Sequence, residues 1–269
     1  MSGIDIRLGK LFNGKKNLVI SAIDHVVEYG DQEGIETSAI AIKKCLKTDA
    51  LLLSRYSLLR NSEFFANKTS PIPVVRVNWT SGFYYPLEYK QGYTTIAADV
   101  ERAVEAGAEM VICSLFLEIG DEKQETKNVE IFSEAVRQKE KLGIPLIGEV
   151  YVIEHKSLTQ EQLHLKVKRV ARVMAELGAD IIKAFYTYKF NEVVENTPVP
   201  VFVIGAEKLS NDLAVLEKAE KSVKMGARGI IFGRNIFMAK EPEKIIAALN
   251  EVLNSGISAE KAALKYGLT

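Results

Sequence analysis

A phrase of seven residues occurs three times along the chain, as AGAEMVI at 106–112, LGADIIK at 177–183 and MGARGII at 225–231. In each copy a glycine follows a segment with helical spacing and precedes a run of apolar residues. Glycine readily adopts the left-handed backbone that ends many helices. A short apolar run after such a signal is typical of a strand that is covered on both faces. The phrase therefore predicts a repeated unit of helix, glycine and buried strand.

The same alternation extends over most of the chain. Apolar runs predict strands at about 17–24, 49–54, 73–79, 109–116, 145–152, 179–186, 199–205 and 227–233. Helical spacing lies between them at 98–107, 160–178, 211–226 and 241–256, and the charged run 121–141 is expected to be a helix on the exterior. Eight strands alternating with helices favour a single (β/α)₈ TIM barrel, an α/β fold, and an open doubly wound sheet is the alternative.

The length permits one domain or two. A chain of 269 residues would fit two average domains, but α/β barrels use about 250 residues as one unit. We expect one barrel domain over 1–269, with an N-terminal extension at 1–16 and an extra C-terminal helix at 257–267. The long irregular stretch 81–97 carries five aromatic residues and is expected to be a lid or a subunit contact.

The amino-acid composition argues against two classes of binding partner, nucleic acids and membranes. Lys plus Arg and Asp plus Glu both number 35, so no net charge attracts the chain to nucleic acid or to an anionic membrane. No apolar run has the length of a signal peptide core or a membrane span, and the cytoplasm is the expected compartment. The isolated Cys45 and Cys113 fit neither a disulfide framework nor a zinc site.

The histidines and glycines predict no cofactor. The histidines are scattered without metal-ligand spacing, so no metal is expected, and His164 is expected on a solvated helix face. No strand is followed by a nucleotide-binding glycine pattern.

Several candidate catalytic residues stand at the carboxyl ends of predicted strands, where barrels place their active sites. Lys183 ends the run ADIIK, and it is either a lysine that pairs with a carboxylate or a desolvated amine able to form a Schiff base. Glu149 and Tyr151 are two residues apart and share a strand face; the alternative is an outward Glu and a packed Tyr. Asp24 and His25 follow the first strand, although Asp is also a common helix-start residue.

The last two strands end in glycine. Gly205 and Ala206 follow one strand, and Gly233 and Arg234 follow the next. Barrels often bind phosphate there through backbone N–H groups, and Arg234 would add a charge-assisted hydrogen bond. The alternative is glycine in tight turns and Arg234 in a surface ion pair.

Four segments together resemble a known family. ISAIDH, GADIIKAFYT, VPVFVIGA and GARGIIFGRNIF, in this order and spacing, resemble the class I aldolases of the archaeal-type fructose-bisphosphate aldolase group. Tagatose-bisphosphate aldolases, deoxyribose-phosphate aldolase, a quorum-signal thiolase and an aminodideoxyheptulosonate synthase are related to that group. The resemblance spans roughly residues 17–250.

The resemblance implies a role for each candidate. Lys183 matches the Schiff-base lysine, Tyr151 the tyrosine that exchanges protons, and Asp24 the aspartate of a DHG motif. Gly205, Gly233 and Arg234 fall where the family holds the substrate phosphate, and we add Ala206 and His25 to that binding set and Glu149 to the catalytic set.

The sequence also departs from the family pattern. Val26 replaces the glycine of DHG, Ala206 replaces the second glycine of a pair, and Glu149 stands where an aromatic residue is common. The continuation of the fifth strand, VYVIEHK, also differs from the family's MYPRG-like segment. These positions line the expected pocket, so they bear on the substrate more than on the imine chemistry.

The resemblance therefore implies a metal-independent, cofactor-free lyase, a class I aldolase that acts on a phosphorylated ketose and forms a homo-oligomer. One alternative is an acyl- or ketose-transfer enzyme with the same imine chemistry, like the thiolase, a transaldolase or the synthase. The other is a barrel that binds sugar phosphate without turnover.

Overall fold

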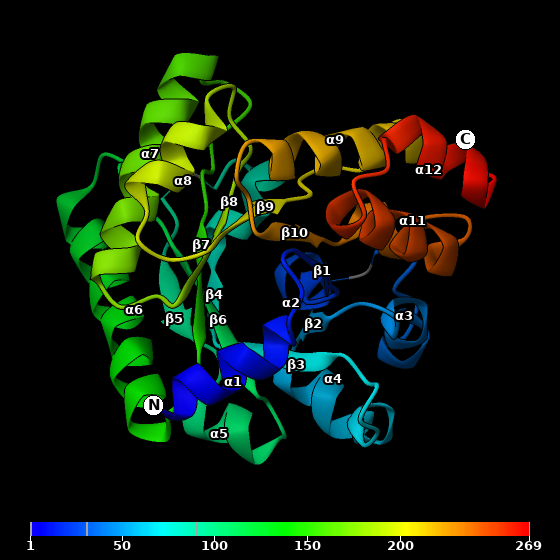
Figure 1. Ribbon diagram of the computed structural model, residues 1–269. Coiled ribbons are helices and arrows are strands. Elements are labelled where there is room, and N and C mark those ends of the chain that lie inside the picture. Colours follow the sequence, from blue (N-terminus) through cyan, green and yellow to red (C-terminus); the bar gives the residue numbers. More distant parts are fainter. Residues whose placement is uncertain (1, 31, 90, 269) are drawn as a thin grey trace.

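The protein is a closed parallel barrel surrounded by helices (Figure 1). The computed structural model describes residues 2–30, 32–89 and 91–268, apart from the side chains of 84–86. Around the barrel the order is β1-β10-β9-β8-β7-β6-β3-β2. The strands are β1 (Leu18–Ala22), β2 (Ala50–Leu53), β3 (Ile72–Arg76), β6 (Met110–Leu115), β7 (Leu146–Val150), β8 (Ile181–Ala184), β9 (Val201–Ile204) and β10 (Gly229–Phe232). Each overlaps one predicted run, so the (β/α)₈ barrel is confirmed and the open sheet is wrong.

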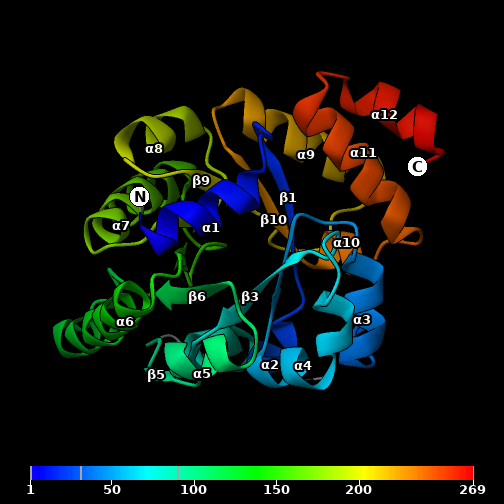
Figure 2. The same cartoon turned by 60° about the horizontal axis from the view of Figure 1, so that its bottom comes forward.

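Helices cover the outside of the barrel, as the two views in Figures 1 and 2 show. They are α1 (Gly3–Phe12), α2 (His25–Tyr29), α3 (Ser38–Cys45), α4 (Arg55–Arg60), α5 (Val100–Glu105), α6 (Glu122–Leu142), α7 (Gln160–Glu176), α8 (Phe190–Asn196), α9 (Asp212–Lys224), α10 (Arg234–Phe237), α11 (Pro242–Asn254) and α12 (Ala259–Tyr266), with two 3₁₀ turns, η1 (Ser62–Phe65) and η2 (Ser81–Leu87). The long α6 is capped at its start by Asp121, whose side chain accepts from the N–H of Gln124, and at its end by the left-handed Gly143.

The glycines of the repeated phrase have the backbone that the pattern predicted. The φ angles of Gly107, Gly178 and Gly226 are 101°, 110° and 94°. At Gly178 a Cβ would also lie 2.8 Å from Cγ1 of Val136. The turn from α7 into β8 therefore requires glycine for its conformation and for the close approach of α6.

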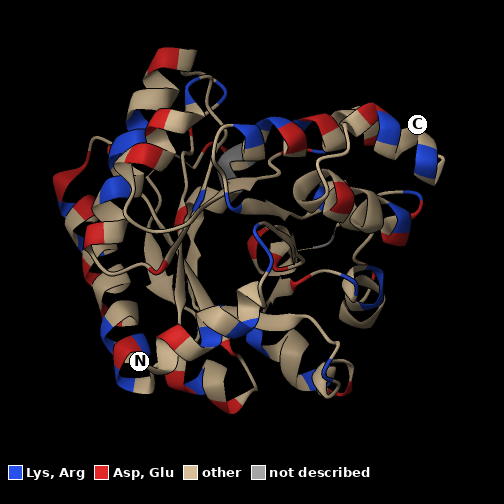
Figure 3. Ribbon diagram, viewed as in Figure 1, with Lys and Arg blue, Asp and Glu red and all other residues tan. Residues whose placement is uncertain are grey.

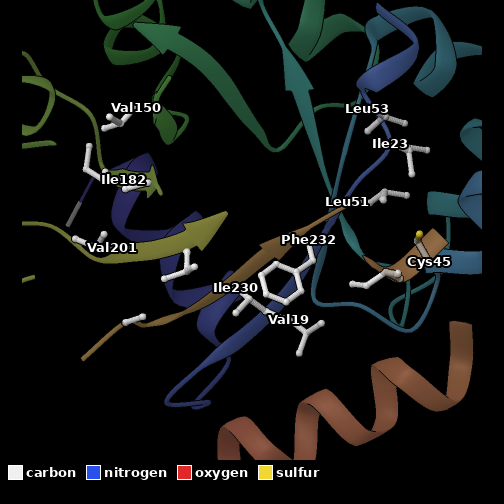
Figure 4. Packing of buried hydrophobic residues seen from close by; sticks show 14 of the residues in the cluster. Val19, Ile23, Cys45, Leu51, Leu53, Val150, Ile182, Val201, Ile230 and Phe232 are labelled. Carbon is white, nitrogen blue, oxygen red and sulfur yellow. The ribbon is translucent and has the colours of Figure 1, made fainter. Parts of the chain in front are cut away.

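Two apolar clusters divide the core. Outward-facing strand residues such as Val19, Leu51 and Ile230 pack against the helices (Figure 4). Inward-facing residues fill the amino-terminal half of the barrel, and Leu8, Leu11 and Phe12 of α1 pack against them. The helix within the predicted extension 1–16 thus covers the amino-terminal end of the barrel, and the other end is left for the polar residues described below.

The segment 81–97 is more regular than the sequence predicted. β4 (Asn78–Thr80) and β5 (Thr94–Ile96) pair antiparallel, with Asn78 opposite Ile96, and η2 lies between them. The predicted strand 73–79 is consequently wrong in extent, because the chain leaves the barrel after Arg76 and begins this hairpin. Two backbone N–H groups, of Ala97 and Ala98, donate to the carbonyl of Val77 and close it.

Aromatic residues of this hairpin have different surroundings. Phe83 is fully buried and packs with Phe116, Tyr151 and Ile153 into a small apolar cluster. Tyr89 and Tyr93 are exposed. Residue 90 and the side chains of Tyr84 and Tyr85, which the predicted lid also includes, lie outside the described residues.

The expectation of a solvated His164 is wrong. Its side chain is 1% exposed, because its face of α7 packs against α8 and the loop before it. Nδ1 lies 3.0 Å from Oγ1 of Thr187, and Nε2 lies 3.3 Å from Oε2 of Glu192. His164 therefore joins three segments of the fold and lies apart from the barrel mouth.

Charged residues of both signs alternate over the outer helices, as Figure 3 shows, and no helix formed by the described residues is both long and apolar enough to span a membrane.

Candidate functional site

Along four neighbouring strands, β3, β6, β7 and β8, the inward-facing residues change from apolar to polar over two positions. Val74, Ile112, Ile147 and Ile181 are buried in the interior apolar cluster; we call these four residues the lower layer. Two positions later on the same strands come Arg76, Ser114, Glu149 and Lys183, which we call the upper layer. Alternate residues of a strand face the same side, so both layers face the barrel interior.

Strand register brings three residues of the upper layer together, whereas Arg76 is in register with Ile112 and reaches them through its long side chain. Ser114 pairs with Glu149, and Glu149 pairs with Lys183, across β6, β7 and β8. Nζ of Lys183 lies 2.5 Å from Oε1 of Glu149, and the two side chains are 6% and 2% exposed. The structure thus places Lys183 as a buried lysine paired with a buried carboxylate, and the formation of a Schiff base at Lys183 stays a prediction.

Arg76 connects the acidic residues of the site. Its Nε donates to Asp24 at 2.6 Å, and one terminal nitrogen contacts Glu149 at 2.8 Å and Glu28 at 3.0 Å. The other terminal nitrogen donates to Oγ of Ser114 at 2.7 Å. Sequence reasoning missed Arg76, although an arginine inside the apolar run PVVRVNW was a usable signal.

The carboxyl groups of Glu149 and Glu28, which both contact Arg76, differ in their pKa. Burial favours the protonated form of Glu149, but the charges of Arg76 and Lys183 outweigh it and hold the pKa of Glu149 below its usual range. Burial raises the pKa of Glu28 to about 8, against the opposing charge of Arg76. At neutral pH Glu149 is therefore a carboxylate and Glu28 a carboxylic acid.

Tyr151 lies at the same mouth with an aromatic partner. Its hydroxyl is 3.1 Å from the hydroxyl of Tyr29, a residue that sequence reasoning missed. Its ring contacts Phe83 and Phe116. Burial, with Tyr29 and Glu28 nearby, raises the pKa of Tyr151 well above its usual value, so the phenol keeps its proton.

The glycine end of the pocket leaves little space at the backbone. A Cβ on Gly233 would lie 2.3 Å from Cε1 of His25 and 2.8 Å from the carbonyl oxygen of Ala22. Ala206 has a left-handed φ of 57°, and its carbonyl accepts from a terminal nitrogen of Arg234 at 2.7 Å. Gly233 therefore lets the His25 side chain and the Ala22 carbonyl approach the main chain closely at the end of β10.

Two buried nitrogens at this end have no hydrogen-bond partner among the described residues: Nδ1 of His25 and Nε of Arg234. Burial lowers the pKa of His25 to about 4, against the charge of Asp24, so the imidazole is neutral. An unpaired buried N–H of Arg234 is a donor that an anionic ligand would satisfy.

Polar side chains behind the turns fix their shape. Asn235 accepts from the N–H of Leu209 at 2.8 Å and donates to the carbonyl of Glu207 at 3.0 Å. Nζ of Lys218 donates to the carbonyl of Gly205 at 2.8 Å. Neither side chain was predicted from the sequence.

One pocket collects the predicted residues. Asp24, His25, Glu149, Tyr151, Lys183, Gly205, Ala206, Gly233 and Arg234 all line it. Glu28, Tyr29, His155, Phe185 and Glu207 line it as well. Within the described ranges no three His, Cys, Asp or Glu side chains are grouped so that they could hold a metal ion.

Comparison with known proteins identifies relatives over nearly the whole barrel. The model of a family described as DeoC/LacD family aldolase matches residues 18–239. A Saccharolobus solfataricus protein named as an uncharacterized aldolase is 30% identical over 261 residues, which cover 94% of this chain and 95% of the relative. A 3-hydroxy-5-phosphonooxypentane-2,4-dione thiolase of Escherichia coli is 28% identical over 98% of this chain and 87% of the relative.

Solved structures show the same fold. An archaeal fructose-1,6-bisphosphate aldolase, whose catalytic lysine is covalently bound to the carbinolamine intermediate, superposes with a TM-score of 0.77. The match has 22% identity and covers 92% of this chain and 98% of that one.

Proposed function

Because this chain belongs to the DeoC/LacD family of aldolases, we propose that it is a class I aldolase. It cleaves or forms a carbon–carbon bond of a phosphorylated ketose through a Schiff base on Lys183. One observation carries the proposal: a buried lysine amine lies 2.5 Å from a carboxylate, in a pocket shared with Tyr151 and the glycine turns.

Lys183 supplies the nucleophile. Its ammonium transfers a proton to Glu149, and the neutral amine then attacks the substrate ketone. Loss of water from the carbinolamine gives an iminium, which withdraws electrons from the adjacent carbon–carbon bond. Asp24, held by Arg76, lies in the same pocket to orient the carbinolamine.

Tyr151 exchanges the proton at the carbon–carbon bond. A phenol with a raised pKa is a proton donor, so in the synthesis direction it protonates the oxygen of the aldehyde as the bond forms. By microscopic reversibility, cleavage starts from the phenolate of Tyr151, which takes the proton of the substrate hydroxyl and so becomes the phenol again. Tyr29 holds the phenol in place through the contact between the two hydroxyls.

The glycine end binds the phosphate. Backbone N–H groups at Ala206 and Gly233, with the unpaired Nε of Arg234, suit a dianion. The N–H of Gly205, which the sequence also placed in this set, already donates to the carbonyl of Ile231, so Gly205 contributes through the shape of the turn. Binding the phosphate there would fix the ketone relative to Lys183.

A transfer reaction is the second candidate, because the thiolase of Escherichia coli covers 98% of this chain. In that case the iminium chemistry is the same and the acceptor of the released fragment differs. Comparing cleavage of fructose bisphosphate and fructose phosphate with and without acyl or aldehyde acceptors separates the two candidates.

Borohydride trapping tests the imine. Reduction in the presence of dihydroxyacetone phosphate is expected to leave a mass adduct on Lys183, in buffer that contains a chelator, because the proposed reaction is metal-independent. Lys183→Met should abolish the adduct, whereas Lys139→Met, which removes a buried lysine paired with Asp180 outside the site, should retain it. Absence of an adduct on Lys183 in the wild type would overturn the imine mechanism.

We further propose that the enzyme is a cytoplasmic homo-oligomer. The exposed Tyr89 and Tyr93 suit a subunit contact, and the free thiols of Cys45 and Cys113 suit a reducing compartment. Light scattering of the wild type measures the oligomer.

A further inference from the structure

Five ionisable groups form one buried cluster at the barrel mouth. Arg76 touches Asp24, Glu28 and Glu149, and Lys183 touches Glu149. The side chains of all five are at most 7% exposed. Their charges therefore act on one another with little screening by solvent.

The cluster contains more acids than bases. Asp24, Glu28 and Glu149 supply three carboxyl groups, against two cations on Arg76 and Lys183. If every group were ionised, the cluster would carry one negative charge without a partner. A buried charge of that kind is costly, and a carboxyl group avoids the cost by taking up a proton.

The contacts indicate which carboxyl takes the proton. Glu149 contacts Lys183 and Arg76 and accepts from Ser114, and Asp24 contacts Nε of Arg76 at 2.6 Å. Glu28 shares a guanidinium nitrogen with Glu149, at the longer distance of 3.0 Å. Glu28 is thus the carboxyl with the weakest compensation, in agreement with its pKa of about 8.

β4 and η2 pack against α2, and their described side chains supply no further charge. β4 consists of Asn78, Trp79 and Thr80, and the described side chains of η2 are Ser81, Phe83 and Leu87. Tyr29 follows Glu28 on the same helix and keeps its proton because burial raises its pKa. Among the described side chains, the ionisable groups near Glu28 are therefore those of the cluster, the tyrosine pair Tyr29 and Tyr151, and His25 of the same helix, which is neutral because burial lowers its pKa to about 4.

We propose that Glu28 is a positioning residue that must hold a proton for Lys183 to become a nucleophile. The inference rests on the proposed imine chemistry and adds a control on it. With Glu28 protonated, the ion pair of Lys183 ammonium and Glu149 carboxylate leaves the cluster neutral. Transfer of the proton from Nζ to Oε1 gives an amine and a carboxylic acid, and the cluster stays neutral.

Ionisation of Glu28 opposes that transfer. The cluster then carries a net negative charge, which stabilises the ammonium form of Lys183 relative to the amine. Since Glu28 is an acid, it keeps its proton below its pKa and loses it above. The rate of imine formation is therefore expected to be limited on the alkaline side by ionisation of Glu28.

The test compares the wild type with Glu28→Gln, whose amide stays neutral at every pH and can still accept from Arg76. For each protein the rate of imine formation with dihydroxyacetone phosphate is measured at pH 7 and pH 9 by borohydride trapping. We expect the ratio of the rate at pH 9 to that at pH 7 to be about tenfold higher in Glu28→Gln than in the wild type, which corresponds to about 1.4 kcal/mol in the free energy of activation. Glu28→Asp keeps a titratable carboxyl and should keep the lower ratio.

Equal ratios in the wild type and Glu28→Gln would overturn the proposal, because a purely structural role would change both rates by the same factor. Infrared spectroscopy of the wild type gives a second measurement that needs no folded variant. A carboxylic acid band that disappears between pH 7 and pH 9 is expected, and its absence at pH 7 would also overturn the proposal. Failure of the imine mechanism would appear separately, as absence of any adduct on Lys183.

Discussion

The lower and upper layers of the barrel are built by the same four strands, yet they have opposite chemistry. Val74, Ile112, Ile147 and Ile181 are completely buried and belong to the interior apolar cluster. Two residues further along, Arg76, Ser114, Glu149 and Lys183 are almost as buried but polar. A step of about 7 Å along each strand therefore separates the residues that pack the core from the polar residues of the candidate site.

The difference shows how a barrel tolerates buried charge. Apolar side chains and α1 fill the amino-terminal half, so the charged residues are supported from below by a dry core. Each charge is compensated within its own layer or by Asp24 from the loop after β1, and Glu28 from the helix that follows stays neutral by holding its proton. The lower layer should thus determine stability, and the upper layer reactivity.

Removal of the phenol of Tyr151 should give the largest effect on reactivity. Tyr151→Phe deletes the proton donor and keeps the ring that packs on Phe83 and Phe116. We expect kcat for cleavage to fall by about 10²–10⁴-fold, with little change in the free energy of unfolding. Borohydride trapping of dihydroxyacetone phosphate should persist, since Lys183 forms that imine; a cleavage rate within a few-fold of the wild type would exclude Tyr151 as the proton donor.

A cavity in the lower layer should lower the stability of the protein and leave kcat nearly unchanged. Ile147→Ala removes a fully buried side chain and is expected to lower the free energy of unfolding by about 2–5 kcal/mol. Urea denaturation measures the loss, and kcat of the protein that remains folded should stay near the wild-type value. A large fall in kcat without loss of stability would show that the two layers are not separable.

A substitution at the phosphate end should have a smaller effect, which depends on whether the substrate carries a phosphate. Arg234→Gln removes the proposed charge-assisted hydrogen bond to the phosphate and is expected to raise KM by about 10–100-fold for a phosphorylated ketose, which corresponds to about 1.4–2.7 kcal/mol. KM for an unphosphorylated analogue serves as the internal control and should change little. An equal rise for both substrates would place the effect of Arg234 in the structure of the turn instead.

Sequence reasoning predicted the site residues that end recognisable strands. It missed Arg76, Glu28 and Tyr29, whose place in the site depends on contacts with residues distant in the chain. Lys183, Glu149 and Tyr151 follow apolar runs, and the period of two predicts a common face. Arg76 also ends a strand, but an arginine in a long apolar run gives no sign of which carboxylates surround it. Glu28 and Tyr29 lie on a five-residue helix, too short for its periodicity to reveal a buried face.

The wrong predictions for His164 and for the strand at 73–79 have the same cause, because both depend on contacts that the local sequence does not reveal. The helical spacing of α7 was evident, but which of its faces meets α8 depends on how the two helices pack. Likewise, the strand propensity of residues 73–79 is genuine, and only the departure of the chain from the barrel after Arg76 divides it between two sheets.

By itself the sequence determined the repeated strand and helix units, because glycine φ angles and apolar periodicity are local properties. It also determined which strands end in reactive or phosphate-compatible residues. Only the tertiary structure decided the charge state of the site. That state depends on three carboxyl groups, from β7 and from the segment that contains α2, meeting Arg76 and Lys183 in a space closed to solvent. Electrostatic energies depend on distance and burial through space, and neither is encoded by neighbouring residues in the chain.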